Sequence, residues 1–146
     1  MVWASTFKSK LNGIWLKQKH AARIIFRKKI THPSRPLLKE LGALNIYQIN
    51  ISQILKFIFN YKFNANPKVF KNYFSKVIHN YSTRFSYNNF KVPKSSLLPK
   101  FSIKLRGPKI WNHFLSEMEK VIQAPNHFKK TVKNKLLNLL NELFYY

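Results

Sequence analysis

The chain has 146 residues, enough for one domain or for one part of a larger protein, and 45% of them are hydrophobic. Its 27 Lys and Arg residues face only four Glu and no Asp, which gives a formal net charge of +23. Two-metal phosphoryl transfer and general acid–base catalysis need several converging carboxylates, so the composition argues against an active site built on carboxylates. Such a charge favours a polyanionic partner, with nucleic acid first and an anionic membrane surface second.

An amphipathic helix is predicted near the N-terminus, from a cap at Ser5 or Thr6 to about Lys28. Apolar residues recur there at steps of three and four residues, and basic residues occupy the other faces. The apolar positions are Phe7, Leu11, Ile14, Trp15, Ala21, Ala22 and Ile25. We expect the helix to bury this face, while its basic exterior is either a solvated surface or a surface that lies against phosphates.

A short second helix and a long third one are predicted next. Residues 31–35 break the pattern, because a residue that precedes proline disfavours the helical conformation. A short helix is expected to open at Ser34 or Arg35, with Pro36 in its first turn, and to run through Leu41, with Gly42 closing it. Asn45 is then a suitable cap for a longer helix over residues 46–62.

The helical pattern loosens beyond the third helix. Pro67 is expected to begin a short helix that ends at Phe74, and residues 75–106 are rich in turn formers. Two stretches, Phe90–Val92 and Phe101–Leu105, alternate with a period of two, which is typical of short strands. We therefore expect an extended, basic insert with one hairpin.

The last part of the chain returns to a helical pattern. Pro108 follows a turn and suits the first position of a helix, in which Trp111 and Phe114 are expected to be buried against the core. A final amphipathic helix is predicted from about Asn126 to Phe144. The predicted fold class is mainly α: an irregular bundle of about five helices with a small extended or β-hairpin insert.

Motifs for enzyme chemistry are missing from the sequence. The three glycines are isolated, so there is no glycine-rich phosphate loop. Without Cys there is no disulfide, thiolate nucleophile or Cys-containing zinc site. The closest histidines, His20 and His32, are twelve residues apart, which excludes a helical pair of metal ligands. We expect no catalytic, cofactor-binding or metal-binding residue in the chain.

Basic residues interleaved with aromatic ones are the positive signal. They occur at residues 71–74, 81–85 and 104–111, where aromatic rings can stack on unpaired bases while Lys and Arg contact the backbone. Only five of the 27 basic residues are Arg, the residue that makes bidentate contacts with base edges. The composition therefore favours binding to the nucleic-acid backbone over reading of a base sequence.

Several motifs follow one another in a recognisable order. They are Trp3 with Phe7, Gln18-Lys19-His20-Ala21-Ala22-Arg23-Ile24-Ile25, Pro36–Leu41, His79-Asn80-Tyr81-Ser82-Thr83-Arg84, Arg106-Gly107-Pro108-Lys109-Ile110-Trp111-Asn112 and Phe128-Lys129. In this order they resemble the region just beyond the palm of non-LTR (LINE-type, Jockey-like) retrotransposon reverse transcriptases. The chain departs from that pattern at Ala4, Lys17 and Ser116, where Gly, Leu and Pro are common.

The resemblance implies the C-terminal region of an RNA-directed DNA polymerase. Residues 1–74 would then be thumb-like helices, residues 75–106 an extended basic insert and residues 107–146 a C-terminal helical region, within one compact unit. The partners implied are RNA and DNA, as a template–primer duplex, together with an upstream palm. The catalytic aspartates and their Mg²⁺ belong to that palm, which is not in this sequence.

The candidate nucleic-acid-binding residues come partly from the matched motifs and partly from charge clustering. They are Lys17, Lys19, Arg23, Arg27, Lys28, Lys29, Arg84, Lys104, Arg106 and Lys109. A second hypothesis remains open, in which a stand-alone basic protein binds RNA or an anionic surface without any polymerase role. No apolar run approaches 18 residues and the N-terminus lacks the pattern of a signal peptide, so we expect an intracellular protein, nuclear or cytoplasmic, without a membrane span.

Overall fold

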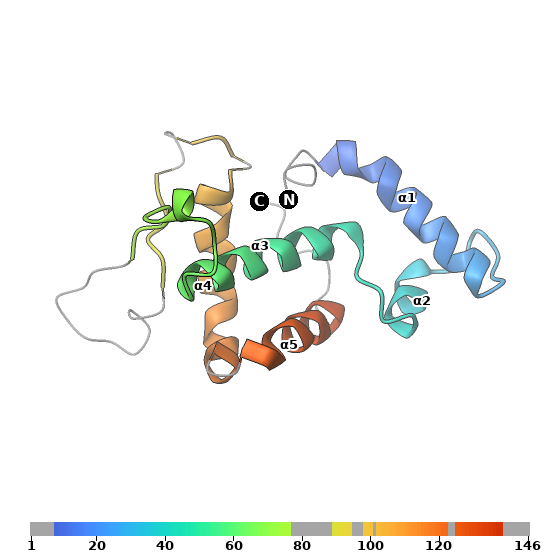
Figure 1. Ribbon diagram of the computed structural model, residues 1–146. Helices are drawn as coiled ribbons and strands as arrows, with labels where there is room; N and C mark the ends of the chain where they lie inside the picture. The colour runs from blue at the N-terminus through green and yellow to red at the C-terminus, as the bar shows by residue number, and fades with distance from the viewer. Residues whose placement is uncertain (1–7, 77–88, 95–97, 101, 123–124, 139–146) are drawn as a thin grey trace. The chain divides into compact units, whose positions relative to one another are not determined.

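The computed structural model describes residues 8–76, 89–94, 98–100, 102–122 and 125–138, with the backbone alone at residues 8, 115–122 and 125–126. Five α-helices and one short 3₁₀ helix make up this described part of the chain (Figure 1). The elements are α1 (Lys8–Ile25), α2 (Ser34–Glu40), α3 (Ile46–Lys62), η2 (Lys68–Phe70), α4 (Ile103–Ile122) and α5 (Pro125–Asn138). The predicted fold class, mainly α with a small extended insert, is confirmed.

The chain divides into two compact units. The first unit consists of Met1–Ser52 and Lys130–Tyr146, and the second consists of Gln53–Lys129. α1 and α2 therefore belong to the first unit and η2 and α4 to the second, while α3 and α5 each contribute residues to both. The division of the sequence after residues 74 and 106 stays a prediction.

Three helices end in the same way, with one residue in the left-handed conformation. These residues are Arg27 after α1, Gly42 after α2 and Asn64 after α3, with φ of 50°, 59° and 54°. In each case the next backbone N–H donates to the carbonyl five residues back, at 2.8–2.9 Å, which satisfies one of the carbonyls that a helix end leaves open. The end predicted at Gly42 is confirmed, whereas α1 ends at Ile25, before the predicted Lys28.

A reciprocal cap begins α3. Asn45 Oδ1 accepts the backbone N–H groups of Tyr47 and Gln48, at 3.0 and 2.9 Å, and Gln48 Oε1 accepts the N–H of Asn45 at 2.9 Å. This arrangement satisfies three donors around the first turn and fixes where the helix begins. The predicted cap and the predicted bounds of this helix are both confirmed.

The core of the first unit is built on a narrower face of α1 than predicted. Leu11 and Ala22 are buried, and Leu11 packs with Ile46 and Tyr47 of α3. The predicted core positions Ile14 and Ile25 are wrong, because their side chains are 46% and 62% exposed. Ala21 is exposed as well, and Phe7 lies outside the described residues.

A polar residue explains this shift of the buried face. Gln18 lies between Trp15 and Ala22 on the inner side of α1 and binds the chain that enters α3. Its Nε2 donates to Leu44 O at 2.8 Å, and its Oε1 accepts the N–H of Ile46 at 3.0 Å. The face that packs inward is therefore centred on a glutamine rather than on the isoleucines.

The second unit has a core of aliphatic residues from α3 and aromatic residues from α4. Ile54, Leu55 and Ile58 are fully buried. Trp111 and Phe114 are 2% and 1% exposed, which confirms their predicted burial.

The start of α4 and the strands before it differ from the predictions. α4 begins at Ile103, so the strand predicted at Phe101–Leu105 is wrong over residues 103–105, and Pro108 lies inside the helix rather than at its first position. Ser102 Oγ accepts the N–H of Lys104 at 3.2 Å and opens the helix ahead of the proline. Phe101 lies outside the described residues.

The remaining elements are shorter than predicted. The helix expected from Pro67 to Phe74 is limited to the three residues of η2. Phe90–Val92 makes a single antiparallel bridge, between Phe90 and Lys76, instead of a strand. α5 begins within one residue of its predicted start, and its predicted end at residue 144 lies outside the described residues.

Candidate nucleic-acid interface

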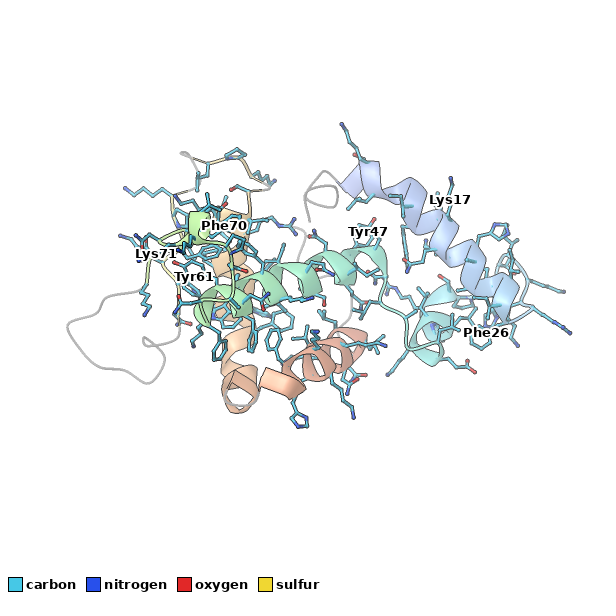
Figure 2. The ribbon with its side chains drawn as sticks, in the orientation of Figure 1. Lys17, Phe26, Tyr47, Tyr61, Phe70 and Lys71 are labelled. Atoms are coloured by element: carbon cyan, nitrogen blue, oxygen red, sulfur yellow. The ribbon has the colours of Figure 1, made fainter. Side chains whose placement is uncertain are left out.

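Three of the six predicted site residues of the first unit lie just beyond the end of α1. Arg27, Lys28 and Lys29 follow that helix directly, and all three side chains are exposed. The exposed side chain of Lys17 lies on the outer side of α1, away from Tyr47 (Figure 2). These cations can meet a phosphate backbone, and those after the helix also suit the negative end of its dipole.

Lys19 and Arg23 are partly buried and already have contacts within the first unit. Lys19 Nζ lies 4.9 Å from the ring centroid of Trp15, at a distance typical of a cation–π contact. Arg23 Nε donates to the carbonyl of His32 at 2.8 Å and so holds the turn that leads to α2. A structural role for Arg23 was not foreseen from the sequence.

The predicted site residues of the second unit lie on the first turns of α4. Lys104 and Lys109 are exposed, and Arg106 is half-buried. Lys104 Nζ lies 5.8 Å from the ring centroid of Tyr73. Arg84 lies outside the described residues. Contact of all these side chains with nucleic acid stays a prediction.

A pocket in the second unit brings together cations that the sequence analysis did not select. It has a volume of about 670 Å³ and lies at the end of α3, beside η2 and the segment that follows it. Four lysines line it, Lys62, Lys68, Lys71 and Lys76, and none of its described lining residues is acidic. Figure 2 shows Tyr61, Phe70 and Lys71, which also line the pocket, grouped beside the end of α3.

Lys62 is the most buried of these four cations. Burial lowers the pKa of its ammonium group, and the neighbouring charge of Lys76 lowers that pKa further. Its Nζ also lies 6.0 Å from the ring centroid of Trp111. The pocket is therefore lined by an ammonium group that is partly removed from water.

An amide completes the pocket wall. Asn89 lines the pocket, and its Oδ1 is buried without a hydrogen-bond partner among the described residues. A buried acceptor without a partner is costly, so a donor that reached this side chain would be bound favourably.

One stretch of the sequence, residues 71–74, indicates part of this pocket. Lys71-Asn72-Tyr73-Phe74 is one of the stretches in which basic residues are interleaved with aromatic ones, and Lys71 lines the pocket. Of the other lysines, Lys62 comes from α3, Lys68 from η2 and Lys76 from the segment that follows η2, and only the fold brings them together.

The described residues contain no group of three His, Cys, Asp or Glu side chains placed to hold a metal ion. None of the described helices is both long and apolar enough to cross a membrane. Comparison with known protein families, with curated proteins and with solved structures finds no match.

Proposed function

We propose that this chain binds nucleic acid through its phosphate backbone, as the thumb-like C-terminal part of a reverse transcriptase from a non-LTR mobile element. It holds a template–primer duplex and carries no polymerase chemistry of its own, because the chain has no Asp with which to hold catalytic magnesium. The observation that carries this proposal is a charge of +23 together with exposed cations clustered at residues 27–29 and on α4.

The mechanism of binding follows from the kind of cation. Lysines act as point charges, and each phosphate that they neutralise releases condensed counterions from the nucleic acid. Binding of this kind is insensitive to base sequence and weakens steeply as salt rises. Lys28 with Lys29 in the first unit, and Lys104 with Lys109 in the second, supply exposed charges of this type.

The polymerase origin is supported by the ordered motifs and by what their residues do. Gln18 bonds to the chain entering α3, and Trp111 is a core residue of the second unit. Asn112 binds the backbone of Phe90 through two hydrogen bonds. These motif residues therefore contribute packing and hydrogen bonds to the fold.

Two charge-reversal variants test the proposal, with the affinity for a fluorescent RNA–DNA hybrid as the readout. Lys28→Glu with Lys29→Glu, and Lys104→Glu with Lys109→Glu, are each expected to weaken binding by at least tenfold at 100 mM salt. A control variant, Lys56→Glu with Lys133→Glu, changes the net charge equally at exposed lysines outside the proposed set. Equal losses in all three variants would contradict the assigned surface, and efficient primer extension by the chain alone would contradict the absence of catalysis.

Exposed isoleucines favour a second candidate function, adsorption to an anionic surface. Ile24, Ile25 and Ile30 are 62–71% exposed and flank Arg27, Lys28 and Lys29. A basic surface with exposed apolar side chains is typical of proteins that adsorb to anionic lipid. Co-flotation with phosphatidylserine vesicles, in the absence of hybrid binding, would favour this alternative.

A further inference from the structure

We infer that the pocket of the second unit binds one nucleotide, either free or as an unpaired nucleotide of a strand, with lysines on its phosphate and Phe70 beside its base. The inference rests on the proposed function in one respect, since the proposed nucleic-acid binding favours a nucleotide over other aromatic anions. The size, charge and rings of the pocket support the site independently of that function.

The size of the pocket suits a small aromatic anion. Its volume of about 670 Å³ lies within the range of roughly 300–1,000 Å³ that is usual for small-molecule sites. Two of its lining residues, Asn64 and Asn72, have φ of 54° and 71°, the left-handed conformation that asparagine tolerates better than most residues. The chain therefore reverses sharply at two points around the pocket.

The charge of the pocket suits a phosphate group. Lys62, Lys68, Lys71 and Lys76 line one cavity, and no acidic side chain is among its described lining residues. The charge of Lys76 already acts on Lys62 across the pocket wall. A bound phosphate relieves this repulsion and gives the poorly hydrated Lys62 an anionic neighbour.

Phe70 is the ring best placed to contact a base. Phe90 is buried. Tyr61 and Phe70 are both half-buried, but the hydroxyl of Tyr61 donates to the carbonyl of Phe74 at 3.1 Å and ties that ring to the backbone. The rings of Phe57 and Tyr73 pack edge-on with that of Phe70, with centroids 5.0 and 5.5 Å away, and so position it at the pocket.

Asn89 adds a polar group that a base or a ribose can use. Its Oδ1 gains a hydrogen-bond partner if the amide turns toward a donor in the pocket, such as an exocyclic amine or a ribose hydroxyl. Phosphate, ring and amide contacts together distinguish a nucleotide from inorganic phosphate.

Calorimetric titration of the full chain tests this inference. The probes are AMP, UMP, adenosine, inorganic phosphate and a ten-nucleotide single strand, and a paired 20-bp duplex is measured in parallel. We expect a mononucleotide or the single strand to bind at least tenfold more tightly than adenosine or phosphate. If the mononucleotides bind, the pocket accepts a free nucleotide. If only the single strand binds, the ligand is an unpaired nucleotide within a strand.

Variants tie the binding to the pocket. Lys71→Ala changes an exposed side chain and is expected to weaken nucleotide binding about tenfold, while Lys94→Ala, an exposed lysine of the same unit outside the pocket, leaves it unchanged. Phe70→Leu is expected to weaken nucleotide binding about fivefold or more relative to the original chain, through loss of base stacking. The circular dichroism spectrum checks that each variant is folded.

Failure of this inference is distinguishable from failure of the proposed function. If neither mononucleotides nor the single strand binds while the duplex does, or if Lys71→Ala and Lys94→Ala behave alike, the pocket assignment is wrong and the duplex surface stands. If nucleotides bind and the duplex does not, the pocket assignment stands and the proposed function fails.

Discussion

Asn112 pairs with the backbone of Phe90 as a neighbouring strand would. Asn112 Nδ2 donates to the carbonyl of Phe90 at 2.8 Å, and the N–H of Phe90 donates to Asn112 Oδ1 at 3.0 Å. The buried ring of Phe90 also packs edge-on against Trp111, the residue before Asn112, with centroids 6.3 Å apart. One turn of α4 thus holds the segment that contributes Asn89 and Phe90 to the pocket.

Removing these two hydrogen bonds is expected to destabilise the folded chain. Asn112→Ala leaves both backbone groups of Phe90 without their partners, and we expect it to lower the free energy of unfolding by about 2–4 kcal/mol. Asn112→Asp keeps the acceptor but sets a carboxylate oxygen against the carbonyl of Phe90, so it should destabilise the chain as well. Urea unfolding measures both, and a loss below about 0.5 kcal/mol in the alanine variant would contradict the assigned role.

Gly107 is packed closely enough that a bulky side chain is expected to destabilise the chain. A Cβ at this position would lie 3.1 Å from Ile58 Cδ1 and 3.2 Å from two ring carbons of Phe74, and both neighbours are buried. Gly107→Val should therefore destabilise the chain by about 1–3 kcal/mol through overpacking. Gly13→Val, in α1 with open space around it, serves as the control in thermal unfolding. Valine has a better helix propensity than glycine, so an unchanged or raised stability at Gly107, as at Gly13, would contradict the role of packing.

Gln18 is expected to stabilise the packing of α1 against the start of α3 in the first unit. Gln18→Leu preserves approximate volume but removes the bonds to Leu44 and Ile46, so we expect a loss of about 1–3 kcal/mol in the free energy of unfolding. Hydrogen exchange at the amide of Ile46 should accelerate, because its partner on α1 is gone. Unchanged exchange at that amide would mean that the start of α3 does not depend on Gln18.

The lowered pKa of Lys62 predicts how stability depends on pH. Since its folded-state pKa lies below the ordinary value of 10.5, the unfolded chain binds this proton more tightly and the charged ammonium destabilises the folded state at pH 7. Lys62→Met should therefore be more stable than the original chain at pH 7, and its advantage should shrink as pH rises from the folded-state pKa toward 10.5. Urea unfolding of both chains across this range measures the difference, and an advantage independent of pH would contradict it.

The sequence predicted those elements that local chemistry determines. Asn45 and the glycine at position 42 marked helix ends correctly, because a cap acts on its own turn. The start of α4 could not be predicted from Pro108, because buried contacts carry the helix back to Ile103 through the proline. The alternation of Phe101–Leu105 imitated a strand, because apolar residues spaced by two also occur along a partly buried helix.

The candidate site was predictable in part for a similar reason. Exposed cations such as Lys28 and Lys109 are evident in a sequence with few acids. The pocket is different, because Lys62 and Asn89 are 27 residues apart and meet only after the chain has turned at Asn64 and Asn72. The local sequence pattern does not indicate that Lys62 and Asn89 lie close together.

The salt dependence of binding to a primed RNA–DNA hybrid is the most direct measurement of backbone recognition. If 6–10 phosphates are neutralised, the affinity should fall by about 10³–10⁵-fold between 50 and 200 mM salt, with log K linear in log salt concentration. The sequence of the hybrid should have little effect. An affinity that stays constant over this range of salt, or no measurable binding at 50 mM, would contradict a nucleic-acid-binding role for this chain.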